Sequence, residues 1–108
     1  MKNDIATAKT PLVAEAALHL GSLVRQRRLA RQWTLAELAE RARVGTATLK
    51  RMEKGAPSVS LGVWLLVFER LGLLTLIKDL NDPAAAALLD ETRAKRARRR
   101  RPATDLDF

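Results

Sequence analysis

Two short helical segments separated by a tight break constrain this sequence more than any other feature. Thr34 precedes the first segment and Glu37 follows three residues later, which is the spacing of a capping box, so a helix is predicted over residues 35–42. Residues 43–45 interrupt the apolar pattern, and a second short helix is predicted over residues 46–54. The sequence therefore predicts two short helices joined by a tight turn.

The flanking sequence predicts further helices. Three- and four-residue spacing of apolar side chains predicts a first helix over residues 12–32. Ser60 and Gly72 bound an almost wholly apolar helix over residues 61–71. Residues 73–80 fit either a short helix or a strand, and we favour the helix. The core-facing residues predicted for the first helix are Ala16, Leu20, Leu23 and Val24.

Composition limits the fold class and the compartment. The chain has 108 residues, of which 47% are apolar and 4% aromatic, so we expect one all-α domain with appendages. It has no cysteine, which excludes a disulfide framework and thiolate metal sites. No apolar run reaches the roughly 18 residues that a membrane span needs, so we expect a cytoplasmic protein with no membrane partner. The expected organisation is a mobile arm over residues 1–11, a helical domain over 12–80, a basic helix over 81–101 and an acidic-aromatic tail over 102–108.

The charge favours a polyanionic partner. The formal net charge is +8, and the sequence pI is about 11.1. Taken alone, this charge leaves nucleic acid, an acidic protein surface and anionic lipid open.

Two short helices after a basic helix and before an apolar one suggest a helix-turn-helix reader of DNA. The stretch WTLAELAERARVGTATLKRMEKG resembles the helix-turn-helix of the XRE family of phage-repressor and Cro-like regulators. LGSLVRQRR is similar to that family's first helix and SLGVWLLVFERLGL to its fourth, so the resemblance covers about residues 18–73. It implies a five-helix, phage-repressor-like domain that represses transcription by binding a double-stranded DNA operator, without a cofactor.

The resemblance also implies roles for individual residues. Arg28 and Glu53 match a buried structural ion pair between the first and third helices. Arg51 is the leading candidate for a base contact, because a guanidinium can donate twice to guanine. The positions implied to read bases are Thr46, Ala47, Lys50 and Arg51. The positions implied to hold phosphate are Thr34 and Leu35, with the backbone amides near Lys54 and Gly55.

Two positions depart from the family pattern. The family commonly has glutamine where Leu35 stands, and leucine cannot bond a phosphate. The cap of the third helix is Gly45 rather than serine or threonine. Arg25 or Arg43 is therefore expected to substitute in holding phosphate, and a module that has stopped reading DNA and binds protein is the alternative.

The apolar fourth helix and the segment after it suggest a homodimer, because one small core cannot cover every face of that helix. The predicted interface residues are Leu65, Leu66, Leu73 and Ile77. A finer resemblance is to HipB-type antitoxins, which imply a HipA-like kinase toxin as partner. A free-standing repressor is the alternative.

Asp82 and Pro83 predict the start of a last helix. This helix carries a dense basic run from Arg93 to Arg101. Its seven basic residues are expected to wrap around the whole helix. Three interpretations of this run stay open: a solvated helix end, a contact with the DNA backbone, or docking on an acidic toxin through Leu106 and Phe108. The run would also suit a protein that binds polyanions without specificity.

Catalytic and metal sites are not expected. His19 is the only histidine and has no partner at catalytic or metal-binding spacing. No phosphate-binding glycine loop or dinucleotide fingerprint is present in the sequence. We therefore predict no enzyme activity.

Overall fold

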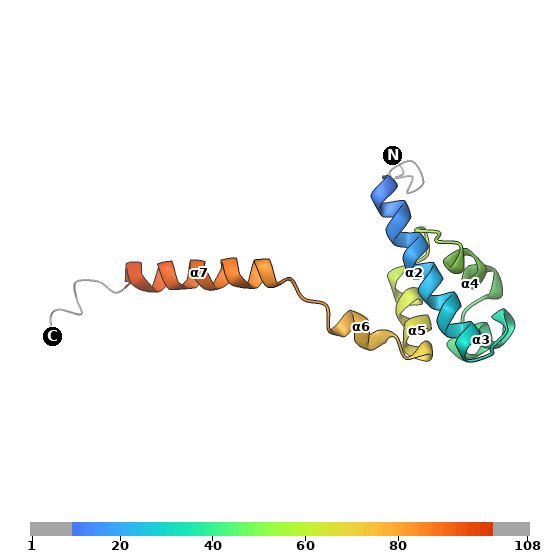
Figure 1. The fold of residues 1–108 in the computed structure, drawn as a ribbon. Coiled ribbons are helices and arrows are strands. Elements are labelled where there is room, and N and C mark those ends of the chain that lie inside the picture. The colour runs from blue at the N-terminus through green and yellow to red at the C-terminus, as the bar shows by residue number, and fades with distance from the viewer. Residues whose placement is uncertain (1–9, 101–108) are drawn as a thin grey trace. The chain divides into compact units, whose positions relative to one another are not determined.

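The computed structural model describes residues 10–100, and within them every regular element is a helix (Figure 1). The chain divides into two compact units, Met1–Lys78 and Asp79–Phe108. The all-α prediction and the five-helix helix-turn-helix domain are confirmed, and residues 73–80 contain a helix rather than a strand. The first unit contains α2 (Pro11–Ala30), α3 (Leu35–Ala42), α4 (Thr46–Glu53), α5 (Leu61–Leu71) and α6 (Leu74–Lys78), and the second contains α7 (Pro83–Arg100).

Side-chain caps set most helix starts. At α3 both capping-box bonds form, because the Thr34 hydroxyl accepts from the Glu37 amide at 3.1 Å and the Glu37 carboxylate accepts from the Thr34 amide at 3.0 Å. The backbone hydrogen bond from Thr34 is the main reason that the pKa of Glu37 lies below its usual value. Ser60 caps α5, and Asp82 accepts from the amide of Ala85 at the start of α7. These starts lie where the sequence placed them.

The first helix differs in two ways from its prediction. Thr10 caps α2 and Pro11 is its first residue, so Pro11 does not belong to a mobile arm; the rest of that arm lies outside the described residues. The buried face also differs from the predicted one, since Leu20, which was predicted to face the core, is 40% exposed. Two of the inward positions carry glycine and arginine, which apolar periodicity cannot detect. The buried residues of α2 are Ala17, Gly21, Val24 and Arg28.

The core of the first unit lies where α2, α3, α4 and α5 pack against one another (Figure 1). Trp33 and Trp64 lie at its edge, and the Trp64 ring meets Phe68 edge-to-face with 6.1 Å between centroids. The buried members of this core are Val24, Leu38, Ala39, Ala42, Leu49, Met52, Val59, Val67, Phe68, Leu71 and Leu73.

The backbones of α2 and α4 approach closely at two glycines. A Cβ atom added to Gly21 would collide with the carbonyl oxygen of Met52 and would lie 3.0 Å from that of Glu53. A Cβ added to Gly55, where φ is +79°, would lie 2.8 Å from Cα of Leu18. The absence of two side chains thus lets α2 lie directly against the end of α4.

Two arginines at the C-terminal end of α2, Arg27 and the C-cap residue Arg31, bind carbonyls at the end of α5. Arg27 donates to the carbonyl of Leu71 at 3.2 Å, and Arg31 donates to that of Arg70 at 3.1 Å. The Arg31 guanidinium also lies 5.2 Å from the Trp33 ring centroid. Part of the basic surface of α2 is therefore used for structure.

Candidate nucleic-acid interface

Helix α4 is divided between a buried and an exposed face. Leu49 and Met52 are fully buried and fix its rotation against the core. The four residues predicted to read bases are all exposed. The helix begins without a hydrogen bond from a capping side chain. One helix face thus presents Thr46, Ala47, Lys50 and Arg51.

A buried ion pair fixes the same helix to α2. Arg28 donates from Nε to one carboxylate oxygen of Glu53 at 2.7 Å and from a terminal nitrogen to the other at 3.0 Å. The guanidinium also donates to the carbonyl of Trp33 at 2.9 Å. The hydrogen bond with Glu53 raises the pKa of Arg28, while burial lowers it. The two side chains are only 10% and 8% exposed, so the pair belongs to the protein interior.

A depression of about 350 Å³ lies beside this pair and gathers residues from three segments. Arg25 comes from α2, Leu35 from α3, and Lys50 and Lys54 from the end of α4. The structure therefore brings a predicted base reader together with three predicted phosphate holders. Exposed ammonium and guanidinium groups around one hollow suit an anion such as a DNA phosphate.

Several predicted phosphate contacts need correction. The amide of Lys54 donates to the carbonyls of Lys50 and Arg51, and the amide of Gly55 donates to that of Met52 at 2.9 Å. These amides close the end of α4, so they are not free to hold phosphate; only the exposed Lys54 side chain remains for this role. The Thr34 amide is used in the capping box, whereas the Thr34 hydroxyl only accepts a bond there and keeps its own proton for a phosphate, so this contact stays a prediction. Leu35 packs against the core.

Arg51 has a neighbour that the sequence analysis did not identify. Its guanidinium donates to the hydroxyl of Ser58 at 2.9 Å, from the loop between α4 and α5. The bond lies in solvent and leaves the guanidinium further donors, since arginine carries five N–H groups. Ser58 therefore orients the arginine side chain on the exposed face of α4.

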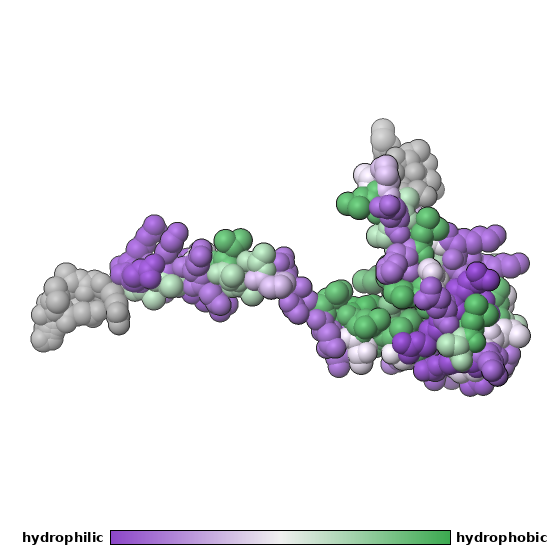
Figure 2. Space-filling model, viewed as in Figure 1, coloured by the Kyte–Doolittle hydropathy of each residue, from purple (hydrophilic) through white to green (hydrophobic). Residues whose placement is uncertain are grey.

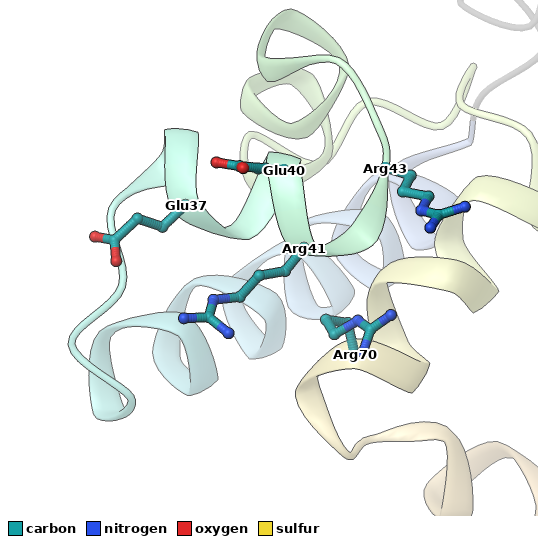
Figure 3. A pocket seen from close by; sticks show the side chains of 5 residues that line it. All are labelled: Glu37, Glu40, Arg41, Arg43 and Arg70. Carbon is teal, nitrogen blue, oxygen red and sulfur yellow. The ribbon is translucent and has the colours of Figure 1, made fainter.

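Arg43 occupies the turn between α3 and α4 with a backbone that favours glycine. Its φ of 58° lies in the left-handed region, which costs an L-residue about 1 kcal/mol or more. Its side chain lines a second depression of about 510 Å³ together with side chains of α3 and α5 (Figure 3). Figure 3 shows Glu37, Glu40 and Arg41 projecting from α3 and Arg70 from α5.

Replacing Arg43 by glycine is expected to stabilise the protein and weaken DNA binding. The gain is about 1 kcal/mol, which raises Tm by about 4–8 °C for a unit of this size. The loss of a phosphate contact lowers the salt slope of DNA affinity by about 0.9. Gln32→Gly is the control, because Gln32 has a φ of 59° and lies outside the two depressions. Thermal melts of both variants should show the gain; equal DNA affinity for both would remove Arg43 from the interface.

The predicted dimer surface is only partly available. Leu73 is 2% exposed and lies in the core of its own chain, because the turn after α5 points it inward; it cannot serve a partner. Leu66 is 48% exposed, and Leu65 and Ile77 are half-buried. Leu76, which lies within the predicted segment from Leu73 to Ile77, is 53% exposed. Hydrophobic side chains gather over α5 and α6 on the face seen in Figure 2.

Comparison with known families identifies the domain. A helix-turn-helix domain family matches residues 19–75, more than half of the chain. This protein belongs to that helix-turn-helix family. No curated protein and no solved structure matches the chain. The helix-turn-helix domain indicates DNA binding, and domains of this type typically carry no catalytic activity.

Residues 10–100 of this helix-turn-helix protein contain neither a membrane-spanning helix nor a cluster of metal ligands. No helix in this range has the length and apolarity to cross a membrane. Nor do His, Cys, Asp or Glu residues of this range cluster as metal ligands would. The predicted tail residues Leu106 and Phe108 lie outside the described residues.

Proposed function

We propose that this protein is a sequence-specific transcriptional repressor that inserts α4 into the DNA major groove. The observation that carries the proposal is the exposed face of α4, where four side chains that can contact bases stand clear of the core. The basic depression beside that face supports it, because phosphate contacts position a reading helix on the duplex.

The proposed roles differ along α4. Arg51 donates to a guanine edge, and Lys50 contacts either a base or a phosphate. Thr46 and Ala47, at the end of the helix that enters the groove first, contact thymine methyl groups. Arg25, Arg43 and the Lys54 side chain hold phosphates.

We propose further that the repressor acts as a homodimer through the exposed side chains of α5 and α6. Association would bury the exposed side chains of Leu66 and Leu76 away from water. The half-buried Leu65 and Ile77 would lie at the border of this interface. Two-fold symmetry then requires operator half-sites about 34 Å apart, one turn of DNA.

Selection of operator sequences from random duplexes tests the reading role. Arg51→Ala is expected to cost about 1–3 kcal/mol on the selected operator and to relax one base position. Lys54→Ala, the matched control on the same helix end, is expected to weaken all sequences alike. Titrations on selected and random duplexes measure both effects. Equal losses for Arg51→Ala on the two duplexes would refute base reading, and selected sites without an inverted repeat would refute the dimer.

The antitoxin role is a narrower proposal that rests on the sequence resemblance alone. A HipA-like kinase toxin would need a surface away from the DNA-reading face of α4. Leu80, which is 75% exposed and is not part of the proposed dimer surface, offers an apolar side chain to such a partner. A neighbouring gene for a kinase-like protein, whose purified product binds this chain without displacing operator DNA, would support the role; a repressor with no such neighbour acts alone.

A further inference from the structure

Helix α7 carries a dense positive charge in its C-terminal half. None of its 18 residues is buried, and Leu88 and Leu89 are 63% and 55% exposed. Repulsion between like charges three or four residues apart weakens such a helix. A partner of opposite charge relieves this repulsion and stabilises the helix.

Five of the six basic residues described in α7 lie on one side of the helix, whereas the expectation that seven wrap around it also counts Arg101, which lies outside the described residues. At 100° per residue, five of the six described ones fall within about 160° of the circumference. Asp90 and Glu91 fall outside that arc, and so does Arg98. The basic face of α7 consists of Arg93, Lys95, Arg96, Arg99 and Arg100.

Charge density distinguishes between possible anionic partners. The basic face extends from Arg93 to Arg100, which at 1.5 Å per residue is about 10 Å of helix axis. Duplex DNA carries one phosphate charge per about 1.7 Å of its axis, or about six charges in the same length. Protein surfaces mix both signs of charge and rarely match this density. On the face seen in Figure 2 the C-terminal half of α7 is mostly hydrophilic, which leaves a protein partner little apolar surface there to bury.

We infer that the basic face of α7 binds the phosphate backbone of DNA as a second, sequence-independent contact of this chain. The inference extends the DNA binding proposed above, in which α4 supplies sequence selection. Arg93 shares its charge with Asp90 at 4.0 Å, so Lys95, Arg96 and Arg99 carry most of the contact. The contact adds affinity for any duplex and retains the protein on DNA while α4 samples sequences.

Arg96→Gln and Arg98→Gln form a matched pair that tests the inference. They remove the same side chain at positions two residues apart. Arg96 lies on the basic face, and Arg98 lies about 160° from Arg96 around the helix axis. Binding of the full chain to a random duplex is measured from about 50 to about 200 mM salt. Arg96→Gln is expected to lower the salt slope by about 0.9, and the triple variant Lys95→Gln, Arg96→Gln, Arg99→Gln by about 2.7. Arg98→Gln should leave the slope unchanged.

The outcomes separate this inference from the proposed function. An unchanged slope in the triple variant overturns the α7 contact with DNA. Equal changes for Arg96→Gln and Arg98→Gln overturn the one-sided face. If Arg51→Ala loses no sequence preference while the triple variant loses slope, the reading role of α4 fails and the α7 contact stands. Circular dichroism of each variant without DNA checks that the helix content is unchanged.

Discussion

Glu53→Ala is expected to destabilise the protein by about 3–5 kcal/mol, because it leaves the buried guanidinium of Arg28 without its carboxylate. The carbonyl of Trp33 remains as an acceptor but cannot balance the charge. Domains of this kind are stable by about 5–15 kcal/mol, so the loss is a large share of the total. Urea titration measures it directly, and Tm should fall by about 12 °C or more.

A double replacement separates burial of charge from loss of packing. Arg28→Met with Glu53→Leu removes both charges together and is expected to cost far less than Glu53→Ala alone. The exposed pair of Asp90 and Arg93 provides the control, because both side chains are more than three-quarters exposed and Asp90→Ala should change stability little. A small effect of Glu53→Ala would show that water reaches the pair.

Gly21→Ala is expected to destabilise the first unit by about 3 kcal/mol, although alanine is the better helix former. The new Cβ meets backbone atoms of Met52 and Glu53, and backbone cannot rotate away as a side chain does. Helices α2 and α4 must move apart, which strains the ion pair between Arg28 and Glu53 as well. Urea titration of the purified variant measures the loss.

Gly62→Ala is the control for this effect. A Cβ at Gly62, on the exposed side of α5, meets nothing within 4 Å, so the higher helix propensity of alanine should stabilise by about 0.5–1 kcal/mol. The two glycine substitutions therefore have opposite expected signs. A stabilising Gly21→Ala would contradict the close approach of α2 and α4.

Local sequence signals predicted the boundaries of most helices. The capping box at Thr34 and Glu37, the Ser60 cap and the glycines at 55 and 72 act within one turn of their own helix, so their effect can be predicted without tertiary information. The largely apolar α5 and the turn between α3 and α4 follow from the same local rules. The architecture was therefore predictable from short stretches of sequence.

Features that depend on contacts between distant segments were not predictable from periodicity. Gly21 and Arg28 are buried because of what α4 places opposite them, and neither carries the apolar side chain that marks a core stripe. The carbonyls at the end of α5 engage Arg27 and Arg31, which the sequence presents only as charge. Burial of Leu73 likewise depends on the direction of the chain after α5.

The division of α4 into a buried and an exposed face separates foldability from specificity. Leu49, Met52 and Glu53 attach the helix to the rest of the unit, and the outward residues add only the bond from Arg51 to Ser58. Substitutions at such outward positions usually change stability by no more than about 0.5 kcal/mol. The outward face can therefore acquire new side chains while the scaffold beneath stays the same, and under the reading role proposed for α4 these would bring new target sequences. This helix is a natural starting point for redirecting the protein to a chosen DNA site.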